Sequence, residues 1–227
     1  MEGPALFEVV TPATAGANRR LITAATVRGL IGSPAGDDAV LEGIIDRASS
    51  LIADECKLAT DLVGTPPSFG AETVRATFAK LSGCGYRRGA KLFLPWRVPI
   101  TAITAVSEDG VALTPADDVK LVPGGLLERR CNGAAVCWSS GEIVVTYAVG
   151  WAVQTAGVAP AGLVGACIDQ VTVMYFSRKI NRSIRSESVP DVHDVVFNVD
   201  GGDSFNERGL LRSVKGALIP YTNPAGR

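Results

Sequence analysis

The chain has 227 residues, of which 47% are apolar and 20% charged, so its composition is that of a globular protein and not of a disordered one. Its formal net charge of −1 excludes a strong overall attraction to nucleic acid or to an anionic membrane. Its N-terminus lacks the features of a signal peptide, and no segment reaches the roughly 20 apolar residues of a membrane span, so we expect a protein made in a cytosol-like compartment.

The N-terminal third predicts an extended arm followed by two helices. Residues 1–21 show no clear period and are expected to form the arm, while Thr23 is placed to cap a helix over 23–31. A longer helix is predicted over 38–57, because apolar residues recur there at steps of three and four. Its expected buried face consists of Leu41, Ile44, Ile45, Ala48, Leu51, Ile52 and Cys56.

From Thr73 the period changes to two, which is typical of half-buried strands. Turn residues then recur at regular intervals up to residue 149. They include Asp109-Gly110, a pair that accepts the positive φ angles of a tight hairpin, and the clusters 123–125 and 139–141. This spacing predicts a small antiparallel β-meander over 73–149 in place of β-α-β units.

Two further helices are predicted after the meander. The first covers 160–178 and the second 206–219, with a polar segment between them in which residues 195–197 could pair as a short strand. The expected buried residues of the first helix are Leu163, Val164, Cys167, Ile168, Val171, Met174 and Tyr175. The predicted fold class is therefore α+β, a helical bundle of about four helices with an inserted small antiparallel β-meander, in one domain over 22–221 with a tail at 222–227.

The residue types needed for catalysis or for metal binding are sparse. The only histidine, His193, lies in a polar stretch, and nothing around it suggests a catalytic triad. The five cysteines are odd in number and too scattered for a zinc site or a disulfide framework. They are Cys56, Cys84, Cys131, Cys137 and Cys167. We therefore predict no catalytic residues, no metal and no cofactor.

One Gly-rich stretch, Ser82 to Gly89, leaves an enzymatic alternative open. Its glycines allow an anion-binding nest, Arg87 and Arg88 would add positive charge, and Cys84 is a possible nucleophile. The stretch lacks the Gly-Lys-Ser/Thr end of a phosphate-binding P-loop, and a connector between strands explains it more simply. The alternative function is a small cytosolic enzyme that uses the Cys84 loop as nucleophile or anion-binding site.

Charged clusters also have two interpretations each. The pairs Asp37-Asp38 and Asp117-Asp118 are better explained by a helix start and a loop than by catalysis. A basic cluster follows the predicted helix 160–178, at a helix end that favours cations. The members of this cluster are Arg178, Lys179, Arg182 and Arg185. They are candidates for contact with DNA in a channel or with an acidic partner. A DNA-binding module that uses this cluster is a third hypothesis.

The order of these elements resembles the head–tail connector (adaptor) proteins of tailed bacteriophages. The resemblance covers about residues 22–221 and depends on motifs taken in order, none of which is diagnostic alone. They are the helices Thr23–Leu30 and Asp37–Lys57, the segment Leu92-Phe-Leu-Pro-Trp-Arg-Val-Pro-Ile100, Val106 through Asp109-Gly110 to Trp138, Val144–Trp151, Val158-Ala-Pro160 with the following helix, and Ala217-Leu-Ile-Pro-Tyr221. The long N-terminal arm and an extended insertion over 184–204 depart from the family pattern.

The resemblance implies a structural, non-enzymatic role in the virion. Such adaptors form a ring, commonly a dodecamer, beneath the portal protein, and they present a platform for a stopper or tail-completion protein. Genomic DNA passes through the channel without sequence-specific contact. The family's terminal helix commonly engages the portal, which makes Leu211, Val214, Leu218 and Tyr221 candidate portal-binding residues here. The expected location is the head–tail interface of a virion assembled in the bacterial cytoplasm.

Overall fold

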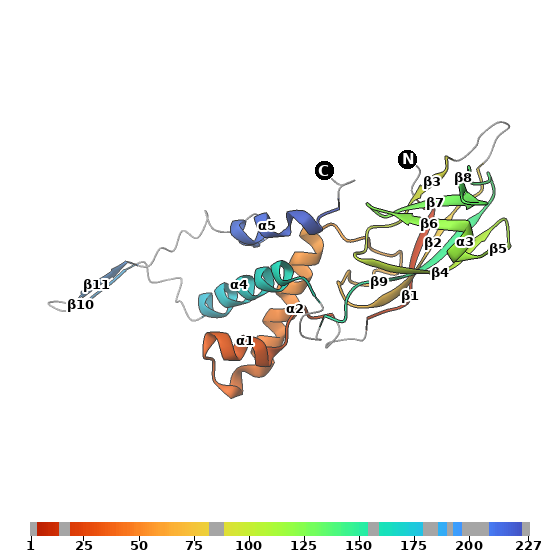
Figure 1. The fold of residues 1–227 in the computed structure, drawn as a ribbon. Helices are drawn as coiled ribbons and strands as arrows, with labels where there is room; N and C mark the ends of the chain where they lie inside the picture. Colours follow the sequence, from red (N-terminus) through yellow and green to blue (C-terminus); the bar gives the residue numbers. More distant parts are fainter. Residues whose placement is uncertain are drawn as a thin grey trace.

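The computed structural model describes residues 4–13, 19–81, 89–153, 159–178, 186–189, 193–196 and 209–223. Figure 1 shows the longer helices gathered on one side of the molecule and most of the strands on the other. We call these two parts the helical unit and the β unit. In the part of the chain that the structure describes, no helix is both long and apolar enough to cross a bilayer.

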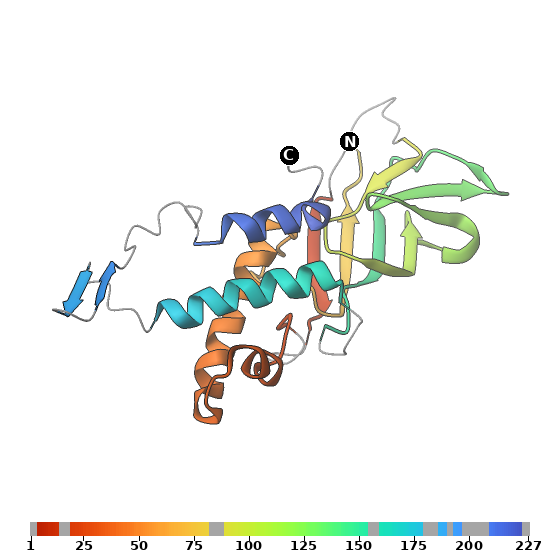
Figure 2. The same cartoon turned by 60° about the vertical axis from the view of Figure 1, so that its left-hand side comes forward.

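Among the described residues, the helical unit contains four α-helices and two short 3-10 turns. They are α1 (Ala24–Ile31), η1 (Ala35–Asp37), α2 (Asp38–Glu55), α4 (Ala161–Ser177), α5 (Arg212–Leu218) and η3 (Ile219–Tyr221). The Thr23 hydroxyl accepts the backbone N–H of Thr26, as predicted for a helix cap, and α1 ends at Gly32 with a left-handed φ of 65°. In Figure 2, α4 crosses α2 and α5 runs beside α4.

Aliphatic side chains from all four helices form the core of the helical unit. The predicted apolar face of α2 points into this core, with Leu41, Ile45, Ala48 and Ile52 fully buried and Ile44 and Leu51 half-buried at its edge. On α4, the predicted residues Leu163, Cys167, Val171 and Tyr175 are buried. The 3.6-residue period of the sequence therefore identified the correct faces of both helices.

A buried glutamine fixes the start of α5. Gln170 of α4 is 0% exposed; its side-chain oxygen accepts the N–H of Leu211 at 2.9 Å, and its nitrogen donates to the carbonyl of Gly209 at 3.0 Å. Gly209 has a φ of 83°, outside the helical region. The predicted helix 206–219 therefore begins only at Arg212, because these contacts hold the preceding residues in a non-helical conformation; residues 206–208 lie outside the described part of the chain.

The β unit consists of two antiparallel sheets. The five-stranded sheet has the order β1-β2-β9-β4-β5, and the other has the order β3-β7-β6 with β8 paired to β7. The strands and a short helix are β1 (Leu6–Thr11), β2 (Glu72–Phe78), β3 (Lys91–Phe93), β4 (Ile100–Glu108), β5 (Val111–Leu113), α3 (Pro115–Asp118), β6 (Val119–Val122), β7 (Leu126–Cys131), β8 (Ala134–Ala135) and β9 (Ile143–Val149).

The strand order differs from that of the predicted meander. In a meander each strand pairs with the next, but β2 pairs with β9 at the opposite end of the unit, so that Thr73 lies opposite Ala148. On its other side β2 pairs with β1, which lies inside the predicted N-terminal arm. The α+β class is observed, yet two sheets replace the single meander, because alternation within a strand predicts which side is buried and not which strand becomes its neighbour.

Between the sheets lies a second core, which contains the aromatic side chains Trp138, Tyr147 and Phe78 among aliphatic ones. The predicted hairpin at Asp109-Gly110 is observed between β4 and β5. Both residues have positive φ angles, 53° and 77°, as a primed two-residue turn requires.

A separate hairpin is formed by β10 (Ser186–Val189) and β11 (His193–Val196), which pair antiparallel within the predicted insertion. Figures 1 and 2 show it on the far side of the helices from the two sheets. Residues 195 and 196 of the predicted short strand belong to β11, and residue 197 lies outside the described residues.

Candidate assembly surfaces

A buried ion pair lies in the β unit at the place where the chain arrives from the helical unit. The side chains of Glu72, the first residue of β2, and Arg97 are 0% and 1% exposed and contact each other through Arg97 Nη1. Arg97 Nε also donates to the carbonyl of Ala59 at 2.9 Å, and Ser68 Oγ donates to Glu72 Oε1 at 3.1 Å. Because two desolvated charges are costly unless fully paired, this network fixes the chain that leaves α2 against the β unit.

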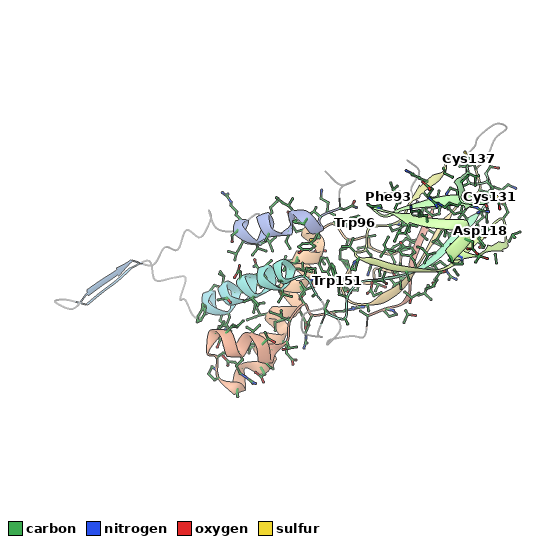
Figure 3. The ribbon with its side chains drawn as sticks, viewed as in Figure 1. Phe93, Trp96, Asp118, Cys131, Cys137 and Trp151 are labelled. Atoms are coloured by element: carbon green, nitrogen blue, oxygen red, sulfur yellow. The ribbon has the colours of Figure 1, made fainter. Side chains whose placement is uncertain are left out.

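The two ends of the β unit meet beside this ion pair. The N–H of Trp151, just after β9, donates to the carbonyl of Phe69 at 2.8 Å, and the two rings lie 6.0 Å apart. Gly150 has a φ of 84°, and a Cβ added to it would lie 1.9 Å from the carbonyl oxygen of Gly70. Only glycine permits this close approach of two backbones. Figure 3 shows Trp151 and Trp96 at the boundary between helices and sheets.

An apolar groove opens next to Trp96. Its volume is about 330 Å³, and it lies between the segment that enters β4 and the turn that joins β6 to β7. Trp96 forms one wall, and its Nε1 donates to the carbonyl of Tyr221 at 3.3 Å, so the C-terminal turn supports the groove. The apolar side chains that line it are Trp96, Val98, Ile100, Leu121, Val122 and Pro123.

The candidate portal-binding residues lie mostly inside the helical unit. Leu211, Val214 and Leu218 are 8%, 1% and 0% exposed and belong to the core of their own chain. Tyr221 is half-buried and packs against this core near Gly162. The resemblance to the connector family makes these three aliphatic side chains candidates for docking, whereas in the structure they pack in the core of their own chain. The exposed residues of this segment are Arg212, Ser213, Lys215, Gly216, Ala217, Ile219 and Pro220.

Of the predicted basic cluster, only Arg178 is described; Lys179, Arg182 and Arg185 lie outside the described residues. Arg178 Nη2 lies 2.6 Å from Asp37 Oδ2, and its guanidinium lies 4.4 Å from the centre of the Tyr175 ring. The Tyr175 hydroxyl donates to the same carboxylate at 2.5 Å. Arg178 therefore ties the end of α4 to the start of α2 and is engaged within its own chain.

The cysteines divide into buried and exposed thiols. Burial raises the pKa of the Cys56 and Cys167 thiols to about 12, so both stay protonated near neutral pH. Cys131 and Cys137 are exposed at the far end of the β unit (Figure 3). Cys84, the candidate nucleophile, lies outside the described residues, and of His193 only the backbone is described.

The acidic pairs have structural partners. Asp37 contacts Arg178 and Tyr175, while Asp38 forms an ion pair with Arg28 of α1 at 2.7 Å. In the second pair, the carboxylate of Asp118 accepts the N–H of Thr114 at 2.9 Å, and this bond with the nearby Arg129 lowers the pKa of Asp118 below its usual value. Among the described residues, no group of three or more His, Cys, Asp and Glu side chains could hold a metal ion.

No protein family model matches the chain, and no curated protein matches it either. Solved structures do match. A chain from the neck of an empty GTA particle, computed with C6 symmetry, superposes with a TM-score of 0.52 at 16% identity and covers 96% of this chain and 95% of its own. A chain from the neck of the native GTA particle, computed with C12 symmetry, gives a TM-score of 0.52 at 14% identity with the same coverage, 96% and 95%.

A third match comes from the virion of the native gene transfer agent (GTA) particle, with a TM-score of 0.50 at 16% identity over 81% of this chain and 89% of that one. At such identities the likeness shows a shared fold. The structural neighbours are thus components of particle necks and virions, in agreement with the resemblance found in the sequence.

Proposed function

We propose that this chain is a structural, non-enzymatic subunit of a head–tail connector. In this proposal, copies of the chain form an adaptor ring, twelve-fold in the family it resembles, between the portal of a DNA-filled capsid and the stopper or tail-completion protein below it. The protein would be made in the bacterial host and retained at the neck of the virion. The ring would leave a central channel through which genomic DNA passes.

The observation that carries this proposal is the extent of the fold likeness. A match over 96% of this chain and 95% of a neck chain includes both the helical unit and the β unit, and not one common motif alone. Because a fold can serve several functions, the likeness gains weight from its agreement with the ordered sequence motifs between residues 22 and 221. The C6 and C12 symmetry of those neck structures supports a ring built of repeated copies.

Contact with the portal, within this proposal, uses the outer surface of the C-terminal segment. Leu211, Val214 and Leu218 could reach a partner only if α5 left its own core, which would expose a large apolar area at a high free-energy cost. The side chains at the surface of this segment include Lys215, which forms an ion pair with Glu55, Ile219, which is 55% exposed, and the partly exposed Tyr221. We therefore favour docking of an intact α5 over its detachment.

For contact with DNA in the channel, the set of candidate residues also becomes smaller. Arg178 is already paired with Asp37, so DNA contact by the basic cluster would depend on Lys179, Arg182 and Arg185. Such contacts would be made with phosphates and would weaken as salt is raised. A neutral Lys179/Arg182/Arg185 variant should therefore affect DNA passage more than ring assembly.

Assembly with a purified portal protein tests the proposal. We expect mass photometry and negative-stain electron micrographs to show rings of this chain, either alone or bound to one end of the purified portal. A protein that stays monomeric at high concentration and ignores the portal would overturn the proposal. The Cys84→Ser variant distinguishes the connector from the enzymatic alternative. A connector should assemble normally with this change, whereas a thiol enzyme should lose its activity.

A further inference from the structure

A small polar pocket lies on the helical unit, beside the segment that leads into α1. Its volume is about 250 Å³, and it is formed by the residues just before α1, the middle of α2 and the loop between α2 and β2. It shares no lining residue with the apolar groove beside Trp96. We call it the Arg19 pocket, and the residues that line it are Arg19, Asp46, Ser49, Ser50, Pro66 and Pro67.

One hydrogen-bond donor in this pocket has no acceptor within the described chain. The Nε atom of Arg19 is buried, and among the described residues nothing accepts a hydrogen bond from it. A buried donor without an acceptor is unfavourable, and more so when it belongs to a charged group. Since guanidinium groups bind anions more strongly than neutral acceptors, the favoured acceptor at this position is an anion.

The acidic side chain of the pocket is already bound by a different arginine. Arg20 Nε and Nη2 donate to the two carboxylate oxygens of Asp46 at 2.7 and 3.0 Å, and Arg20 Nη1 lies 3.3 Å from a carboxylate oxygen of Glu42. This bidentate geometry turns both oxygens of Asp46 toward Arg20. Asp46 therefore does not satisfy the Nε atom of Arg19, although the two side chains line one pocket.

A second donor in the pocket comes from Ser49. This residue is only 7% exposed, and its Oγ accepts the N–H of Leu21 at 3.2 Å. That bond does not use the hydroxyl hydrogen, whose other contact, Cys167 Sγ at 4.0 Å, is long. The hydroxyl can therefore donate to an acceptor in the pocket. The wall formed by Pro66 and Pro67 has no N–H groups and is apolar, so it suits methylene groups and not further anionic oxygens.

We propose that the Arg19 pocket binds one carboxylate group, from an aspartate or glutamate side chain of a protein partner. Arg19 Nε is the charged donor, the Ser49 hydroxyl is the neutral donor, and the two prolines contact the methylene groups of the bound side chain. DNA fits this site less well, because the side chains of Asp46 and Glu42 beside it are 50% and 48% exposed and repel a polyanion. The source of the carboxylate rests on the connector function proposed above, under which it belongs to a neighbouring copy or to the portal.

An NMR titration with acetate tests the pocket without any partner protein. We expect acetate to shift the Nε–H resonance of Arg19 in a saturable way, and a short DNA duplex at the same ionic strength to leave it unchanged. Arg19→Lys keeps the charge but lacks this N–H group, so its spectrum identifies the resonance. Arg47→Gln, at an exposed arginine of α2, is the matched control and should respond to acetate like the wild type. The proposal is overturned if acetate causes no saturable shift, if DNA shifts this resonance instead, or if Arg47→Gln abolishes the response.

Binding assays with Arg19→Gln then identify the source of the carboxylate. We expect this variant, with its fold checked by circular dichroism, to raise one dissociation constant at least about tenfold, measured by mass photometry and sedimentation. Weaker contact between protomers assigns the carboxylate to a neighbouring copy, and weaker binding of purified portal assigns it to the portal. If neither constant changes, the pocket does not serve a protein partner and the proposal is wrong. A wild type that neither assembles nor binds the portal would refute the connector function, whereas the acetate titration would still decide whether the pocket binds a carboxylate.

Discussion

The two units of the molecule obtain their stability from contacts of different sequence range. In the helical unit, each helix has a regular apolar face, and the core is mainly aliphatic with the aromatic side chains of Phe69 and Tyr175 buried in it. In the β unit, the central pairing joins β2 to β9, which are far apart in the sequence, and the core includes Trp138 and Tyr147. Where the units meet, the buried Glu72–Arg97 pair of the β unit holds the chain that leaves α2 through the carbonyl of Ala59. Trp96, Val98 and Trp151 also pack against the helical core, so the two apolar cores are coupled by a junction with polar and apolar contacts.

The largest loss of stability is predicted for a substitution at that junction. Arg97→Ala leaves the Glu72 carboxylate buried without its cation, and we expect it to destabilise the protein by roughly 3–5 kcal/mol. Arg75→Ala is the matched control, because its ion pair with Glu8 is 47% and 31% exposed and should contribute about 0–1 kcal/mol. Chemical denaturation followed by fluorescence measures both. Equal effects of the two variants would contradict the idea that burial makes the junction important.

A matched pair of core truncations tests whether the two units unfold together. Leu163 in the helical core and Leu127 in the β core are both 0% exposed, and replacement of either by alanine should cost about 2–5 kcal/mol. If the junction couples the units, both variants shift one common transition, as seen by calorimetry. Two separate transitions, each sensitive to only one of the variants, would show that the units are independent.

A smaller effect is expected at Gln170, which links α4 to the start of α5. Gln170→Ala leaves the N–H of Leu211 and the carbonyl of Gly209 without their buried partner, at a cost of about 1–3 kcal/mol. Hydrogen exchange should show faster opening of α5 while α2 keeps its protection. Thr172→Ala, which removes only a bond to the carbonyl of Ile168 in the same helix, is the control. Unchanged exchange in α5 would show that packing alone holds this helix.

The smallest effect concerns pH and the turn from Asp61 to Thr65, between α2 and β2. Burial alone would raise the pKa of Asp61, but the hydrogen bonds from Thr65, Val9 and Gly64 outweigh it and lower this pKa below the usual 3.8. The folded state therefore binds this proton less readily than the unfolded state does, so the stabilisation is complete above the unfolded pKa and is lost as pH falls through the folded pKa. Asp61→Asn should cost roughly 1 kcal/mol at neutral pH and flatten this part of the acid-unfolding curve. A variant with the wild-type acid response would exclude Asp61 as its source.

The sequence predicted the helices well because their stability depends on a local period. The spacing of Leu41, Ile45, Ala48 and Ile52 identifies the buried face of α2 without knowledge of its neighbours. The same period does not tell whether the apolar face of α5 serves its own chain or a partner, and the choice of Leu211, Val214 and Leu218 as portal-binding candidates depends on the family resemblance alone. Only the packed structure shows that they are already buried.

Strand pairing and the partners of buried polar groups could not be predicted from a local period of apolar residues. Residues 6–11 show no clear period, so the sequence predicts an arm where the structure has β1 paired with β2. Glu72, Arg97 and Gln170 resemble surface residues in any one-dimensional pattern, because their partners lie far away in the sequence. The prolines on both sides of Trp96 and Arg97 were the one local sign of an unusual backbone at the junction.

The path of the chain between the two units has a mechanical consequence. The polypeptide passes from β1 to α1, from α2 to β2, and from β9 to α4, so neither unit is one continuous stretch of sequence. A force that pulls the helices away from the sheets is therefore shared by several covalent segments that act in parallel, and no single linker carries the whole load. A subunit built in this way resists forces that would pull its helical unit and its β unit apart.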